Sequence, residues 1–170
     1  MAIAVLIGPP GSGKSSIGRA LAKHLEQEFV DTDALIENQE GRSIGEIFKQ
    51  SGEEKFREIE SAIVVHQLSH ADGIIALGGG AILNPHTQSA LKNCQADVVF
   101  LNVSASNAVP RVSANSSRPL LNENPGEQWS ALMQARLPIY TELADITIAT
   151  DNKKAQEVAL EIAARLKEHA

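Results

Sequence analysis

Eight residues near the N-terminus constrain the fold more than any other part of this chain. Residues 8–15 read Gly-Pro-Pro-Gly-Ser-Gly-Lys-Ser and match the phosphate-binding pattern G-x-x-x-x-G-K-[ST]. The preceding run, Ala2–Ile7, is wholly apolar, which is typical of a strand buried on both faces of a parallel sheet. The following segment, Ser15–Glu28, repeats apolar residues at helical spacing. A strand, a glycine-rich turn and a helix in this order predict a binding site for a nucleoside triphosphate.

The chemistry of phosphate binding explains why this turn needs its residue types. Glycines let the backbone curl so that several N–H groups point at phosphate oxygens. Lys14 adds a positive charge for the β- and γ-phosphates, and the Ser15 hydroxyl coordinates the Mg²⁺ that accompanies ATP. On this turn and just after it, the predicted nucleotide contacts are Gly11, Ser12, Gly13, Lys14, Ser15 and Ser16.

Motifs of other nucleotide-binding classes are missing from the sequence. The base-reading pattern N-K-x-D of GTPase switches is not formed, because Asn152-Lys153 continues as Lys154-Ala155. A strand that ends in an acidic residue does not follow either, since Gly73–Leu77 runs into three glycines. A carboxylate to support Mg²⁺ must come from elsewhere, and Asp31 at the end of the second predicted strand offers one.

Apolar runs and helical stripes alternate along the rest of the chain. The predicted strands are Ala2–Ile7, Phe29–Thr32, Gly73–Leu77, Asp97–Val103 and Ile146–Ala149. The predicted helices are Ser15–Glu28, a short helix opened by a capping box at Ser43, Glu53–His70, a helix beginning near Pro85, Gln128–Leu143 and Ala155–His169. This alternation predicts an α/β fold in one domain of 170 residues, with a five-stranded parallel sheet covered by helices on both faces.

Composition narrows the range of partners. The formal net charge of −6 gives no general basic field, which argues against binding to nucleic acid. The N-terminal apolar run is shorter than a secretory core of about 7–15 residues or a membrane span of about 20. A single cysteine, Cys94, indicates a reducing compartment. We expect a cytoplasmic monomer that binds small molecules and has no membrane or nucleic-acid partner.

One segment interrupts the alternation of strands and helices. It covers about residues 112–126, is rich in Ser, Asn and Pro, and is too long for a typical connection. Loops of this length are usually functional or disordered, and we interpret this one as a mobile lid. Its Arg118 would close over the phosphates when the lid folds down.

Two further groups of residues follow predicted strands, so they fall at the edge of the sheet where ligands gather. In Asp31-Thr32-Asp33, the carboxylate of Asp33 fits two interpretations. It would orient an acceptor hydroxyl and take its proton, or it would cap a helix over Ala34–Gln39. The segment Gly78-Gly79-Gly80 would let the backbone approach a ligand closely, or it would form a tight turn and no more.

Two arginines on predicted helices also have two interpretations each. Arg57 lies between Glu53 and Glu60, so pairing on the helix surface is one explanation and substrate binding is the other. Arg136, within Gln128–Leu143, leaves the same choice open.

The order of these motifs resembles that of the shikimate kinase family over nearly the whole chain. Besides the phosphate turn, four segments carry the resemblance: a signature from Asp31-Thr32-Asp33 through Gly52-Glu53 to Phe56-Arg57 and Glu60, the segment Leu77-Gly78-Gly79-Gly80-Ala81, the lid segment Arg118-Pro119-Leu120-Leu121, and Arg136 with Pro138 and Tyr140. The resemblance implies a three-layer fold similar to that of nucleoside monophosphate kinases. It also implies transfer of the ATP γ-phosphoryl group to the 3-hydroxyl of shikimate, in aromatic amino-acid biosynthesis.

The resemblance further implies a role for each matching residue. Asp33 would bind the shikimate hydroxyls and act as the base, while Arg57 and Arg136 would hold the carboxylate through fork geometry. A backbone group of Gly79 would contact the ring. The implied nucleotide and metal roles fall on Lys14, Ser15, Arg118 and Asp31. Two alternatives stay open at this stage: another small-metabolite kinase of the same fold, acting on gluconate or a nucleotide, and a nucleotide-binding regulatory module without an acceptor.

Overall fold

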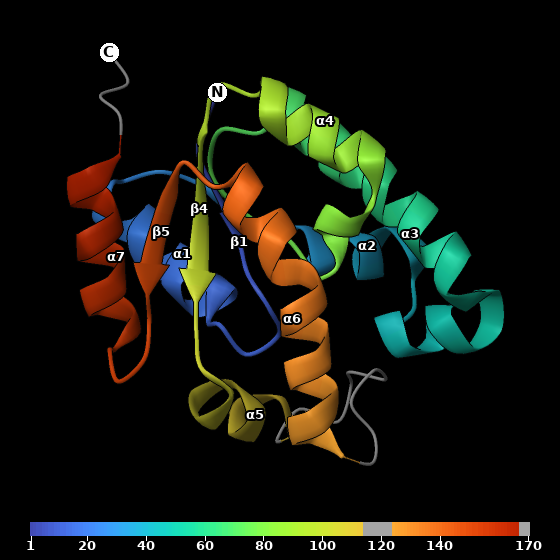
Figure 1. Ribbon diagram of the computed structural model, residues 1–170. Helices are drawn as coiled ribbons and strands as arrows, with labels where there is room; N and C mark the ends of the chain where they lie inside the picture. Colours follow the sequence, from blue (N-terminus) through green and yellow to red (C-terminus); the bar gives the residue numbers. More distant parts are fainter. Residues whose placement is uncertain (114–123, 167–170) are drawn as a thin grey trace.

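The sheet places the phosphate turn in the middle of the molecule. A computed structural model describes residues 1–113 and 124–166, and all statements below concern these residues. Five parallel strands pair in the order β2-β3-β1-β4-β5, and Figure 1 labels β1, β4 and β5. Their bounds are β1 Ala2–Ile7, β2 Phe29–Asp31, β3 Gly73–Ala76, β4 Asp97–Asn102 and β5 Ile146–Ala149. Because β1 is central, the turn that follows it opens at the centre of the sheet's carboxyl edge.

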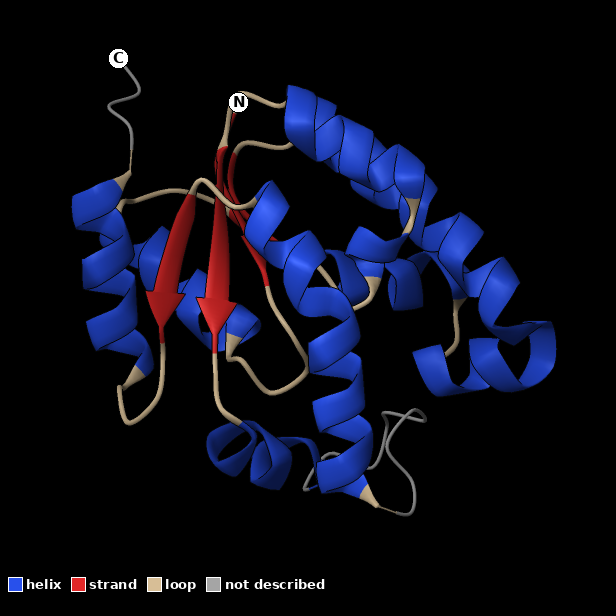
Figure 2. Cartoon of the chain, in the orientation of Figure 1, coloured by secondary structure: helices blue, strands red, loops and turns tan. Residues whose placement is uncertain are grey.

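Helices cover both faces of this sheet and complete three layers (Figures 1 and 2). One face packs against α1 (Lys14–His24) and α7 (Ala155–Arg165), and the other packs against α3 (Ile44–His70), α4 (Pro85–Asn93) and α6 (Pro125–Leu143). Alternate residues of β1 explain why both faces are apolar. Ala4 and Leu6 pack in the apolar core on the α1 and α7 face, while Val5 and Ile7 pack in the core on the α3, α4 and α6 face. The predicted fold class is confirmed.

Three short elements gather near the carboxyl ends of the strands. They are α2 (Thr32–Glu40), the 3₁₀ helix η1 (Ala81–Leu83) and α5 (Ala105–Ser113), and α5 lies at the lower edge in Figure 1. None of the helices in the described ranges is both long and apolar enough to cross a membrane.

The observed elements differ from the predicted ones where tertiary contacts outweigh local pattern. Thr32 begins α2 instead of ending β2, and its buried hydroxyl donates to the Ala76 carbonyl across 3.3 Å. The two helices predicted on either side of Gly52 are both present, and together they make up α3, which is kinked at that glycine, where φ is +85°. Helix α1 ends at His24, four residues before the predicted end.

The predicted lid overlaps two observed helices. Val112 and Ser113 belong to α5, and Pro125 begins α6, so the ends of the segment are helical. The prediction missed α5. Arg118 belongs to residues 114–123 of the sequence, which are outside the described residues.

Candidate functional site

The phosphate turn has the conformation that its glycines predict. Gly11 and Gly13 have φ values of +82° and +88°, which L side chains rarely adopt, and α1 begins directly after Gly13. A Cβ atom on Gly11 would also lie 2.6 Å from the Ala108 carbonyl oxygen. The Lys14 ammonium donates to the Gly8 carbonyl at 2.7 Å and the Pro9 carbonyl at 3.0 Å. The Lys14 side chain and the backbone carbonyls of the turn are therefore held together by hydrogen bonds within the turn itself.

A pocket opens over this turn and contains a basic residue that the sequence analysis missed. Its volume is about 200 Å³, and it is lined by Gly11, Gly13, Lys14, Ser15, Ser16, Arg111 and Val112. The Arg111 guanidinium, on α5, donates to the Gly11 carbonyl at 2.9 Å. Apolar residues at helical spacing (Ala105, Ala108, Val109 and Val112) were the signal that could have revealed α5 and thus Arg111.

Asp31 joins the phosphate turn to α2. Its Oδ2 atom accepts a 2.7 Å hydrogen bond from the Ser15 hydroxyl, while its Oδ1 atom accepts from the backbone N–H groups of Asp33 at 3.0 Å and Ala34 at 3.4 Å. Asp31 is therefore the N-cap of α2, and the alternative that Asp33 caps this helix is wrong.

The same pair of oxygens suits a magnesium ion. Mg²⁺ prefers oxygen ligands and is usually bound through one or two carboxylates together with substrate phosphates. Ser15 Oγ and the Asp31 carboxylate supply such a set beside the phosphate turn. No group of three or more His, Cys, Asp or Glu side chains with metal-binding geometry occurs in the described parts of the chain. The Ser15 and Asp31 oxygens thus fit Mg²⁺ as part of a ligand set that phosphate oxygens would complete.

The three glycines after β3 are each pressed against a different neighbour. A Cβ atom on Gly78 would lie 2.6 Å from Asp33 Oδ1 and 3.0 Å from Glu60 Oε2. On Gly79 it would lie 3.1 Å from Cδ of Pro10, in the phosphate turn, and on Gly80 it would lie 2.7 Å from Cζ of Arg57. Residues 78–80, called the glycine turn below, therefore let charged side chains and the phosphate turn approach their backbone closely.

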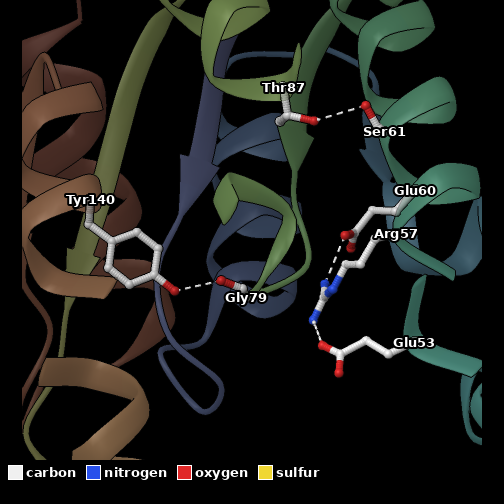
Figure 3. Close-up of polar contacts among 7 residues, drawn as sticks. All are labelled: Glu53, Arg57, Glu60, Ser61, Gly79, Thr87 and Tyr140. Atoms are coloured by element: carbon white, nitrogen blue, oxygen red, sulfur yellow. Dashed lines mark hydrogen bonds and ion pairs between the residues drawn. The ribbon is translucent and has the colours of Figure 1, made fainter. Parts of the chain in front are cut away.

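Arg57 reaches this turn from α3 as part of an ionic group (Figure 3). Its guanidinium pairs with Glu60 at 2.8 Å and with Glu53 at 3.4 Å, so the predicted pairing along the helix is present. Glu60 is only 2% exposed. Its burial raises the pKa of the carboxyl group, and the Arg57 charge counters part of this effect. The Arg57 Nε atom is buried and has no hydrogen-bond partner within the described residues.

Arg136 is a buried residue of α6. It is 3% exposed, so the alternative of a surface-paired arginine is wrong. Four residues later, the Tyr140 hydroxyl donates to the Gly79 carbonyl at 2.6 Å (Figure 3). Near the start of the same helix, the indole N–H of Trp129 donates to the Pro10 carbonyl at 2.8 Å. Helix α6 therefore contacts both the glycine turn and the phosphate turn.

The structure brings the predicted acceptor residues to one place. Asp33 and Glu60 face Gly78, and Glu60 is paired with Arg57. The charge of Asp33 further raises the pKa of Glu60, and the charge of Arg136 lowers it. In Figure 3 the glycine turn lies between Tyr140 on one side and Arg57 with Glu60 on the other. The burial of Glu60 is the feature that sequence reasoning did not anticipate.

Comparison with known proteins shows the family of the chain. The family model described as shikimate kinase matches residues 10–167. The chain belongs to the shikimate kinase family. A curated shikimate kinase of Rhodococcus erythropolis is 46% identical over 166 residues, which cover 97% of this chain and 97% of that protein.

Solved structures of shikimate kinases share the fold. The chain superposes on "Shikimate kinase from Acinetobacter baumannii in complex with shikimate" with a TM-score of 0.91 and 35% identity, covering 96% of this chain and 94% of that one. A gluconokinase from Sinorhizobium meliloti matches with a TM-score of 0.59 and 19% identity, covering 96% and 90% of the two chains. This second likeness extends to the fold alone, so it gives no support to gluconate as the acceptor.

Proposed function

We propose that this chain transfers the γ-phosphoryl group of ATP to the 3-hydroxyl of shikimate, giving shikimate 3-phosphate and ADP. One observation carries the proposal beyond family membership. The glycine turn, with Asp33 and Arg57 against it, packs directly on Pro10 of the phosphate turn. An alcohol bound beside Asp33 would then lie next to a nucleotide bound at Lys14.

Asp33 is the residue to which we assign the proton. Its carboxylate would orient the 3-hydroxyl toward the γ-phosphorus and accept its proton as the new oxygen–phosphorus bond forms and the bond to the ADP oxygen breaks. The two guanidiniums would hold the shikimate carboxylate at the other end of the ring: Arg136, which is buried, and Arg57, with its unpartnered Nε atom. The backbone N–H of Gly79 would contact the ring, since its carbonyl is engaged by Tyr140.

The remaining roles concern the transferred phosphoryl group. Lys14 would exchange its bonds to the turn carbonyls for the β- and γ-phosphates. Ser15 and Asp31 would hold Mg²⁺, which when bound neutralises charge on the phosphates. Arg118, carried by the predicted lid, would add a further positive charge and exclude water. Gly11, Ser12, Gly13 and Ser16 would complete the cradle.

A coupled assay of ADP release tests the proposal. We expect ADP release with ATP and Mg²⁺ to be slow alone, to rise strongly with shikimate, and to stay unchanged with gluconate or a nucleoside monophosphate. Stimulation by gluconate or a nucleoside monophosphate, without stimulation by shikimate, would assign the chain to another small-metabolite kinase. Slow hydrolysis that no hydroxylated acid stimulates would favour a regulatory module.

A further inference from the structure

Tyr140 occupies a position in the site that the phosphoryl transfer described above does not explain. Its side chain is fully buried, and its ring stacks on Phe100 of β4 at a centroid distance of 5.0 Å and an interplanar angle of 17°. The Tyr140 hydroxyl points away from this ring stack and donates to the Gly79 carbonyl at 2.6 Å (Figure 3). A buried phenol needs a hydrogen-bond partner, and here the partner is the backbone of the glycine turn.

The same hydroxyl also lies beside Arg136. Residues four apart on a helix share a face, so Arg136 and Tyr140 project from α6 in the same direction. The Arg136 guanidinium lowers the pKa of Tyr140 by its charge and by hydrogen bonding, but burial outweighs this and raises the pKa to about 12. The phenol therefore stays protonated near neutral pH and keeps its donor for Gly79.

These contacts connect two groups that reach shikimate from different elements. Gly79 comes from the turn after β3, and Arg136 comes from α6. We propose that Tyr140 is a positioning residue for shikimate, whose hydroxyl fixes the spacing between the Gly79 backbone and the Arg136 guanidinium. This inference rests on the proposed function, because it concerns how tightly the acceptor is held.

The ring and the hydroxyl have separable tasks, which makes the inference testable. Tyr140→Phe keeps the stack on Phe100 and removes only the donor to Gly79. Thr87→Val is the matched control, because Thr87 is also fully buried and its hydroxyl also makes a hydrogen bond, to Ser61 at 3.4 Å (Figure 3). Thr87 lies on α4 and takes no part in the proposed site.

The experiment measures KM for each substrate at saturating levels of the other. For Tyr140→Phe we expect the shikimate KM to rise roughly tenfold and the ATP KM to change less than about twofold, since the loss of one buried hydrogen bond falls on the acceptor side. For Thr87→Val we expect both constants to stay within about twofold of the original. A shikimate KM that rises no more in Tyr140→Phe than in Thr87→Val would overturn the inference, as would equal rises for both substrates.

A double-mutant cycle with Arg136→Lys tests whether Tyr140 acts through Arg136. We expect the two changes in shikimate KM to be non-additive. In Arg136→Lys the guanidinium that the Tyr140 hydroxyl positions is absent, so the further loss of that hydroxyl should have a smaller effect. Strictly additive changes would contradict the coupling.

A measurement without any substitution covers the case in which Tyr140→Phe does not fold. Tyr140 is the only tyrosine in the chain, so 3-fluorotyrosine labelling places a single ¹⁹F resonance at this site. Shikimate should shift this resonance, whereas a shikimate titration that leaves it unmoved would refute the inference. If the unlabelled enzyme releases no additional ADP with shikimate, the proposed function fails instead, and the two failures are thereby distinguished.

Discussion

The two halves of the site are built in different ways. The phosphate turn is a contiguous stretch, residues 8–15, in which glycine conformations and backbone carbonyls determine the shape. The acceptor half draws on α2, α3, the glycine turn and α6, which are more than a hundred residues apart at their extremes. A local motif thus specifies the nucleotide half, whereas tertiary packing assembles the half to which we assign acceptor binding.

The two halves also differ in how charge is held. The Lys14 ammonium donates to carbonyl groups of its own turn, so neighbouring residues of the same segment hold its side chain in place. Arg57 is held by the buried Glu60, and both lie against glycines of a separate segment. We therefore expect substitutions in the acceptor half to alter acceptor binding and turnover while leaving ATP binding intact.

The largest expected effect is that of Asp33→Asn. Loss of the proton acceptor should reduce turnover by roughly 10²–10⁴-fold, the range for a positioned base, and ATP affinity should stay unchanged. Single-turnover kinetics and ATP titration would measure the two quantities. Glu58→Gln, which changes an exposed carboxylate on α3, serves as the control. Turnover of Asp33→Asn close to that of the control would remove Asp33 from the role of base.

The next effect in size is that of Arg136→Lys. A lysine keeps the charge but cannot form the two parallel hydrogen bonds of a guanidinium, so the shikimate KM should rise about 10–100-fold. The ATP KM should change much less, because Arg136 belongs to the acceptor half. Steady-state kinetics with each substrate varied in turn would check this, and a larger change in the ATP KM would contradict the division into halves.

A smaller effect is expected for Gly80→Ala. The added methyl group would displace the Arg57 guanidinium, whose Cζ would lie 2.7 Å away, and the shikimate KM should rise by about tenfold. Gly126→Ala is the matched control, because nothing lies within 4 Å of a Cβ atom at that position. If both variants bind shikimate equally well, the close contact between Gly80 and the Arg57 guanidinium does not contribute to shikimate binding.

The smallest effect concerns the pH dependence of stability. Burial holds the pKa of folded Glu60 above its ordinary value of 4.5, so between the two values the folded state keeps a proton that the unfolded state releases. Its contribution to stability is therefore complete below the ordinary value and is lost as pH rises through the folded pKa. Glu60→Gln should lose less stability than the original protein over this rise, as urea unfolding at several pH values would reveal. An unchanged pH profile would show that Glu60 titrates normally.

Much of the fold was predictable because its signals are local. The apolar runs of β1, β3 and β4 and the strand–turn–helix order around residues 8–15 predicted the sheet and the phosphate turn, and the structure confirms both. Helix α5 was missed because its short sequence runs into the Ser- and Asn-rich segment, which obscures the apolar spacing. Arg111 was missed with it.

In the acceptor half, Asp33 and the three glycines were already candidates because they follow predicted strands, whereas the binding roles of Arg57 and Arg136 came only from the resemblance to a family. From spacing alone, Arg57 and Glu60 look like a surface pair on a helix, because neither residue reveals that the helix packs on a glycine turn. The burial of Arg136 likewise depends on where α6 lies in the fold. The roles assigned to these residues, and to Arg118 and the predicted lid, stay predictions for the experiments above.

Helix α6 has a consequence for observing the enzyme at work. Trp129 is the only tryptophan in the chain, and its indole is bonded to Pro10 of the phosphate turn. With excitation that only tryptophan absorbs, the fluorescence of the unmodified protein therefore originates from a single side chain bonded to the phosphate turn. Binding of ATP should change the Trp129 emission directly, because Trp129 contacts the phosphate turn. Binding of the acceptor at Arg136 should change it through α6, the helix that carries both residues.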